Sequence, residues 1–150
     1  MTTQLPIFEG SLDDDAFTFR AVPVQELREI WPLLQYGLEE VRTSNGEVWI
    51  AEDVYASLLY GQATLYLIHD ADGTLQGFGI FKVFHFDYDF ESTLLVWIGW
   101  SKYRHNGHLG REMTQKIKRA AGIKRAVYST TQENPWVLRD RKLHTWYEIE

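Results

Sequence analysis

Hydrophobic and polar positions in the first third of the chain predict one strand and two helices. Phe17 to Val22 alternates as a strand does, and Val24 to Leu38 places apolar residues at helical spacing. Pro23 suits the first turn of that helix, whereas Pro32 removes a backbone donor and should kink or split it. A second helix is predicted from Ala51 to Gly61.

The middle of the chain reads as three consecutive strands, Ala63 to His69, Leu75 to Phe86 and Thr93 to Trp100. Asp70-Ala71-Asp72-Gly73 is a hairpin turn signal between the first two strands. A polar turn over 87–89 separates the second strand from the third. Because the connections are short, we expect an antiparallel meander.

A crossover follows the meander. A helix is predicted from Leu109 to Ala121, ended by Gly122 as a left-handed cap, and a strand from Lys124 to Thr130. A strand–helix–strand connection joins parallel strands. We therefore expect the strands on either side of this helix to run parallel and to diverge near Ile98 and Ser129.

The tail completes the predicted order β-α-α-β-β-β-α-β-α-β. It holds a helical turn near Pro135 to Arg141 and a last strand from His144 to Ile149. This order predicts one α/β domain, with a mixed, mostly antiparallel sheet and helices on both faces.

The N-terminus has a different pattern. Residues 1–15 show no periodicity and carry the run Asp13-Asp14-Asp15, so we expect a flexible acidic arm before a domain over 16–150. Such an arm is either simply solvated or docks on a partner. The sequence has no signal-peptide pattern and no apolar run of about 20 residues, so we expect a cytoplasmic protein without a membrane partner.

Charge is distributed unevenly along the 150 residues, whose net charge is −6. Residues 1–101 carry four Lys and Arg against sixteen Asp and Glu, a net of −12, whereas 102–125 carry eight against one, a net of +7. The basic segment is either a solvated helix face or a site that attracts anions. The absence of Cys excludes disulfides, thiolate metal sites and a cysteine nucleophile.

The segment from Tyr103 to Arg111 carries the most informative chemistry. It leaves a strand and opens a helix, where unpaired N–H groups and the helix dipole bind phosphate. Gly107 and Gly110 allow close backbone approach or a positive φ. His105 and His108 have no third ligand at metal-binding spacing. The overall acidity, and the lack of aromatic residues between the basic ones, argue against a nucleic-acid partner.

This segment resembles the coenzyme A motif of the GNAT acetyltransferases, which is Gln or Arg, two residues, Gly, one residue, then Gly or Ala. Arg104 and Gly107 match, whereas Leu109 occupies the last position and Gly110 follows it. Asn134-Pro135 is similar to the start of the family's last helix. The resemblance is strong over 94–136 and topological over 16–93.

The resemblance implies a GNAT-like acyl-CoA N-acyltransferase fold that binds acetyl-CoA or coenzyme A and acetylates an unknown amine. Backbone N–H groups near the end of the third meander strand would polarise the thioester carbonyl. The implied cofactor-binding residues are Ile98, Gly99, Trp100, Arg104, His105, Asn106, Gly107, His108, Leu109, Gly110, Arg111 and Asn134.

The residue that would protonate the leaving thiolate departs from the family. A Tyr commonly lies seven residues after the Asn, where this chain has Arg141, so Tyr147 is the candidate catalytic residue. A guanidinium stays protonated at any working pH and cannot replace a Tyr as proton donor. We therefore expect slow turnover or none.

A second interpretation stays open. The compact size and the run Leu58 to Ala63 resemble small GNAT-like proteins of bacteriophages. That resemblance implies a weak or inactive module for protein interaction, with virion proteins or a second copy of the chain as partners. Its location would then be the host cytoplasm or the virion.

Overall fold

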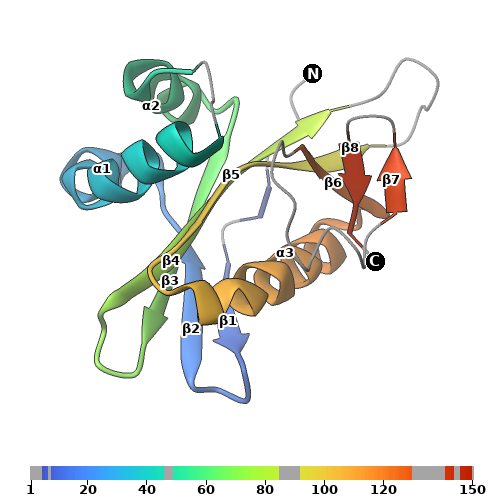
Figure 1. Cartoon of the computed structure of the whole chain (residues 1–150), viewed down its shortest axis with the longest axis horizontal. Coiled ribbons are helices and arrows are strands. Elements are labelled where there is room, and N and C mark those ends of the chain that lie inside the picture. The colour runs from blue at the N-terminus through green and yellow to red at the C-terminus, as the bar shows by residue number, and fades with distance from the viewer. Residues whose placement is uncertain are drawn as a thin grey trace.

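The described part of the chain forms an eight-stranded sheet in the order β1-β2-β3-β4-β5-β6-β8-β7, with helices on both of its faces (Figure 1). The computed structural model describes residues 5–6, 8–45, 49–84, 92–129, 141–143 and 146–149. The elements are β1 (Glu9–Leu12), β2 (Phe17–Ala21), α1 (Val24–Asn45), α2 (Ala51–Leu59), β3 (Thr64–Asp70), β4 (Leu75–Phe84), β5 (Thr93–Ser101), the 3₁₀ turn η1 (Arg104–Asn106), α3 (Gly107–Ala121), β6 (Arg125–Ser129), β7 (Arg141–Leu143) and β8 (Trp146–Glu148).

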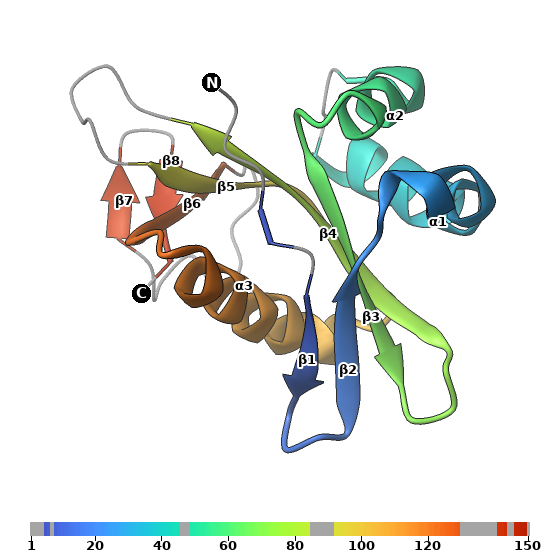
Figure 2. The same ribbon diagram turned by 180° about the vertical axis from the view of Figure 1, so that it is seen from behind.

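The fold class agrees with the α/β prediction, and the meander is confirmed. Neighbouring strands from β2 to β5 pair antiparallel, whereas β5 and β6 pair parallel. The helix pair α1 and α2 covers one face of the sheet, and α3 crosses the other (Figures 1 and 2). Gly122 ends α3 with φ 69° and ψ 24°, the left-handed cap that the sequence predicts.

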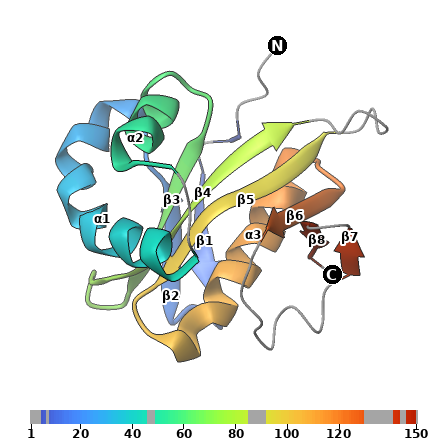
Figure 3. The ribbon, with the colours of Figure 1, turned by 45° about the horizontal axis from the view of Figure 1, so that its top comes forward.

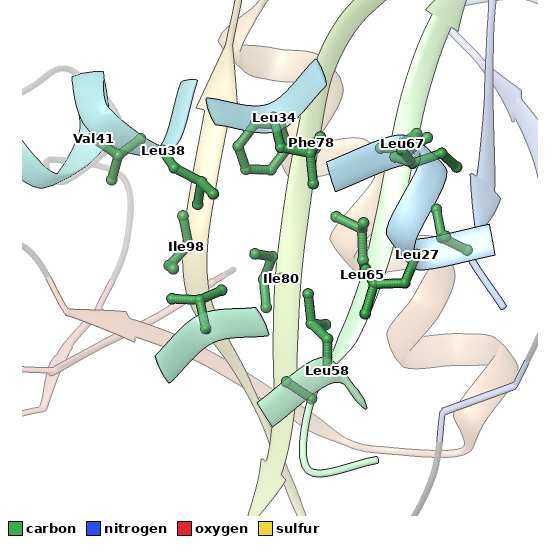
Figure 4. Close-up of a cluster of buried hydrophobic side chains, with 14 of the residues drawn as sticks. Leu27, Leu34, Leu38, Val41, Leu58, Leu65, Leu67, Phe78, Ile80 and Ile98 are labelled. Carbon is green, nitrogen blue, oxygen red and sulfur yellow. The ribbon is translucent and has the colours of Figure 1, made fainter. Parts of the chain in front are cut away.

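Two hydrophobic cores hold these layers together. The first lies between the sheet and α1–α2, where Leu34 and Leu38 of α1 meet Phe78 and Ile80 of β4 (Figure 4). In the second core, side chains of α3 cover the opposite face of the sheet. Its fully buried members include Tyr66, Phe81, Leu109, Met113 and Ile117.

Helix α1 contains Pro32, which the sequence predicts to kink or split it. Pro32 does not split it, because a single helix spans Val24–Asn45 with the proline inside. A proline inside a helix costs about 3 kcal/mol. The apolar stripe that includes Leu27, Leu34 and Leu38 is buried against the sheet and offsets that cost.

The N-terminal segment differs from the predicted flexible arm. Within the predicted arm, Glu9–Leu12 forms β1 and pairs antiparallel with β2. Leu12 is 1% exposed in the second core, and Tyr66 Oη donates a hydrogen bond of 2.6 Å to the Pro6 carbonyl. A single buried leucine beside polar neighbours gives too little periodicity to predict such a strand.

The tail differs from the prediction where it is described. The expected helical turn near Pro135 lies outside the described residues, but its last residue, Arg141, begins strand β7. The predicted final strand corresponds to β8, which lies between β6 and β7. The predicted polar turn over 87–89 also lies outside the described residues.

Candidate functional site

Strands β5 and β6 stay paired over part of their length only. Parallel pairing runs from Thr93 opposite Arg125 to Val96 opposite Tyr128, and β5 then continues to Ser101 beyond its last partner in β6 (Figure 3). This confirms the prediction of a parallel pair that ends near Ile98 and Ser129. Among the residues that the structure describes, backbone groups on one side of β5 therefore have no sheet partner beyond this point.

A β-bulge lies where the pairing ends. Ile80 is opposite Ile98 and Phe81 is opposite Val96, so Trp97 is an extra residue in β5. Bulges re-aim the backbone and increase local twist. The bulge therefore explains how β5 turns away from β6 while it remains paired with β4.

The register between β4 and β5 determines which N–H groups of β5 point toward β4 and which point toward the side where β6 has ended. The Lys102 N–H donates to the Gln76 carbonyl of the β4 side at 2.8 Å. Because N–H groups alternate sides along a strand, those of Ile98 and Trp100 also point toward β4. The Gly99 N–H points the other way. Of the three backbone groups proposed from the sequence, Gly99 is thus the one that faces the end of β6.

Space is available beside Gly99. The residue is exposed and lies opposite Gly79, where the Phe81 ring and the Met113 methyl occupy the space that a Gly79 side chain would take. A Cβ at Gly99 would meet only Val96 Cγ1, at 3.8 Å. The Trp100 ring lies on the other face, where it packs against Phe78 with ring centroids 5.5 Å apart.

The start of α3 leaves its first N–H groups without a side-chain cap. Asn106 is the N-cap and makes no side-chain capping bond, and the first turn contains no acidic residue. Gly107 has φ −58° and ψ −28°, so it is helical and does not use a positive φ. A Cβ at Gly110 would have nothing within 4 Å. Packing therefore gives no reason for glycine there. The Asn106 and Gly107 N–H groups already donate to the Tyr103 and Arg104 carbonyls, so an anion at this helix end would meet the other N–H groups.

Between Arg104 and Arg111, some side chains lie in the core and others on the surface. Leu109 is 1% exposed in the second core, so it can offer a ligand only its backbone. Arg104 and His105 are exposed, and the His105 ring stacks on Tyr103 with centroids 5.5 Å apart. Arg111 is half-buried. Asn134 lies outside the described residues.

The turn between β1 and β2 is a neighbour that the sequence did not reveal. The Asp13 N–H donates to the Glu112 carboxylate at 3.0 Å, and Asp13 Oδ2 lies 3.7 Å from His108 Nε2. Asp13, Asp14 and Asp15 have φ of 51°, 53° and 73°, in the left-handed region. The acidic run is thus a hairpin turn beside the first turns of α3.

Tyr147, the candidate donor, and Arg141, at the position where the family commonly has a Tyr, lie on the last two strands. Tyr147 of β8 is opposite Tyr128 of β6 and Lys142 of β7, so its backbone shares a row with the last β5–β6 pair. Arg141 begins β7, opposite Glu148.

Within the described residues, no group of three or more His, Cys, Asp or Glu is placed to hold a metal ion. The same residues contain no helix long and apolar enough to cross a membrane.

No protein-family profile matches the sequence, and no curated protein matches it. Solved structures do match the fold. A GNAT family acetyltransferase from Listeria monocytogenes superposes with a TM-score of 0.57 at 12% identity, covering 88% of this chain and 92% of that one. The chain has the fold of the GNAT acetyltransferases.

Two further GNAT-like structures are similar. A Pyrococcus furiosus protein with an acetyl transferase assignment has a TM-score of 0.60 at 19% identity, covering 85% of this chain and 94% of that one. An aminoglycoside acetyltransferase from an uncultured soil metagenomic sample, solved with sisomicin, has a TM-score of 0.60 at 11% identity and covers 84% and 85%. At these identities the likeness establishes the GNAT fold alone.

Proposed function

We propose that this GNAT-fold protein binds coenzyme A at the start of α3 and transfers the acetyl group of acetyl-CoA to an amine. The observation that carries the proposal is the end of β5–β6 pairing at Val96 and Tyr128, beside Gly99 and a helix start without a side-chain cap. A pyrophosphate would accept hydrogen bonds from the N–H groups of α3, with Gly110 leaving room for close approach. The net charge of +7 over 102–125 favours the same ligand.

Acetyl-CoA is a substrate in this proposal and supplies a thioester whose carbonyl an amine can attack. The Gly99 N–H is the group that would donate to the carbonyl oxygen as negative charge develops there. A preorganised donor of this kind is typically worth about 3–4 kcal/mol of barrier. Ile98 and Trp100 contribute differently, because their N–H groups are directed toward β4 and keep the strand in place.

The amine must lose a proton and the departing thiolate must gain one. Tyr147 is our candidate donor, supported by the position of its backbone in the row where β5 and β6 separate. Arg141 can stabilise a thiolate as a charge but cannot donate a proton. Because general acid–base help is worth about 10²–10⁴ in rate, we expect turnover to depend strongly on Tyr147.

The test is release of free thiol from acetyl-CoA in the presence of a panel of amines, aminoglycosides and peptides. We expect slow thiol release with at least one acceptor, and its loss in Tyr147→Phe with coenzyme A binding retained. Equal rates in the parent and Tyr147→Phe would exclude Tyr147 as donor. The acetylation proposal fails if no acceptor on a broad panel releases thiol, even though coenzyme A raises the melting temperature as a bound ligand should.

A second candidate is a GNAT-like interaction module, of the kind that bacteriophages encode, with virion proteins or a second copy of the chain as partner. Large apolar side chains exposed on α1 and at the end of α2 favour it, with Leu33 66%, Tyr36 73% and Tyr60 77% exposed. Coenzyme A binding without thiol release on any acceptor would support this role.

A further inference from the structure

Lys82 places an amine beside the bulge where β5 leaves β6. It lies on β4 directly opposite Leu95, and its Nζ is 3.7 Å from the centroid of the Trp97 ring. Trp97 is the bulge residue and the first residue of β5 beyond the last pair with β6. The Lys82 side chain therefore reaches across β5 toward the point where the two strands separate.

The amine lies on the face of the sheet opposite α3. Residues two apart on a strand share a face, so Lys82 lies on the same side as Ile80, which packs in the core beneath α1 and α2. Trp97 packs against that same core. A pantetheine chain that runs from the start of α3 through the gap would present its thioester to this face, next to Trp97.

Two features make the amine suitable as a nucleophile. Burial lowers the pKa of the Lys82 ammonium below its ordinary value, which raises the fraction of neutral amine near pH 7. None of the ion pairs between described side chains involves Lys82. Among the described residues, the face of the Trp97 ring attracts the Lys82 ammonium and holds it beside the bulge.

We infer that Lys82 is itself an acetyl acceptor, so that the protein modifies its own β4 strand. This inference rests on the proposed function. The neutral nitrogen attacks the thioester carbonyl carbon, a C–N bond forms and the C–S bond breaks. The sulfur leaves with the bonding electron pair and takes up the proton lost by nitrogen, giving free coenzyme A and a neutral amide at Lys82.

Lys102 is a matched control within the same chain. Its Nζ also lies over an aromatic ring, 5.4 Å from the centroid of Tyr103, but it follows the end of β5 and is away from the bulge. After incubation with acetyl-CoA, peptide mass mapping should find Lys82 acetylated at least about tenfold faster than Lys102, because only Lys82 reacts within a bound complex. Lys82→Arg should remove one acetyl group from the intact mass, whereas Lys102→Arg should not.

A binding readout separates this inference from acetyl transfer in general. With isotopically labelled lysines, coenzyme A itself should shift the NMR signal of the Lys82 ε-carbon. If coenzyme A binds but Lys82 neither shifts nor reacts faster than Lys102, the inference is wrong while the proposed site stands. If coenzyme A does not bind, the proposed function and this inference both fail.

Discussion

Replacing Gly110 by alanine should stabilise the fold and weaken coenzyme A binding. Gly110 is the fourth residue of α3, and a Cβ there meets nothing within 4 Å. Glycine costs about 1 kcal/mol relative to alanine inside a helix. Gly110→Ala should therefore stabilise the protein by about 0.5–1 kcal/mol.

For a chain of this size, that gain corresponds to a rise of roughly 1–4 °C in melting temperature. Thermal and urea unfolding followed by circular dichroism measures it. Gly37→Ala is the control, since it makes the same change inside α1. There, a Cβ would lie 2.7 Å from Phe78 Cε2 and 2.7 Å from Trp100 Cδ2, so we expect a loss of about 1–3 kcal/mol.

Coenzyme A binding should move in the opposite direction in Gly110→Ala. If a phosphate approaches the helix closely at this position, the added methyl should weaken binding by about tenfold, or about 1.4 kcal/mol. A destabilised Gly110→Ala would contradict the local geometry of α3. A stabilised variant with unchanged affinity would show that no phosphate approaches Gly110.

Three smaller predictions concern other contacts. Asp13→Asn should strengthen coenzyme A binding about twofold at low salt in calorimetry, because it removes a negative charge beside His108, and the gain should vanish at high salt. Asp70→Asn should reduce the loss of unfolding free energy as the pH falls. The pKa of folded Asp70 lies below 3.8 because the Thr74 N–H donates to its carboxylate, so the ionised carboxylate stabilises the fold above pH 3.8 and this stabilisation is lost as the pH drops through the folded pKa. Urea unfolding at a series of pH values measures the difference. Tyr66→Phe should lose about 1 kcal/mol and speed proteolysis near residues 5–12, because the bond to Pro6 disappears; unchanged proteolysis would contradict this.

The central fold could be predicted from the sequence because its elements bury one face each. The strands from Thr64 to Ser101 and helix α3 show that periodicity directly, and short turns or a crossover fix their order. Strand β1 could not be predicted in this way, because its stability comes from pairing with β2 and from the burial of Leu12 under α3. Pro32 does not split α1 for a related reason, since tertiary packing outweighs a local penalty.

The site could be predicted as a segment but not in its detail. The glycines and positive charges after β5 indicate a phosphate site from residue types alone. The choice of Gly99 over Ile98 and Trp100 depends on register and on a bulge at Trp97, which no local pattern encodes. The contact of Asp13 with Glu112 joins residues 99 positions apart and is equally invisible in the sequence.

Calorimetric titration of coenzyme A into the parent protein and Gly110→Glu tests the central claim most directly. Gln115→Glu is the matched control, because it adds the same charge to α3 farther from its first turn. We predict saturable binding to the parent and to Gln115→Glu, and affinity at least about tenfold weaker in Gly110→Glu, a difference of about 1.4 kcal/mol. No binding to the parent, or equal affinity in all three proteins, would contradict the assignment of the coenzyme A site to the start of α3.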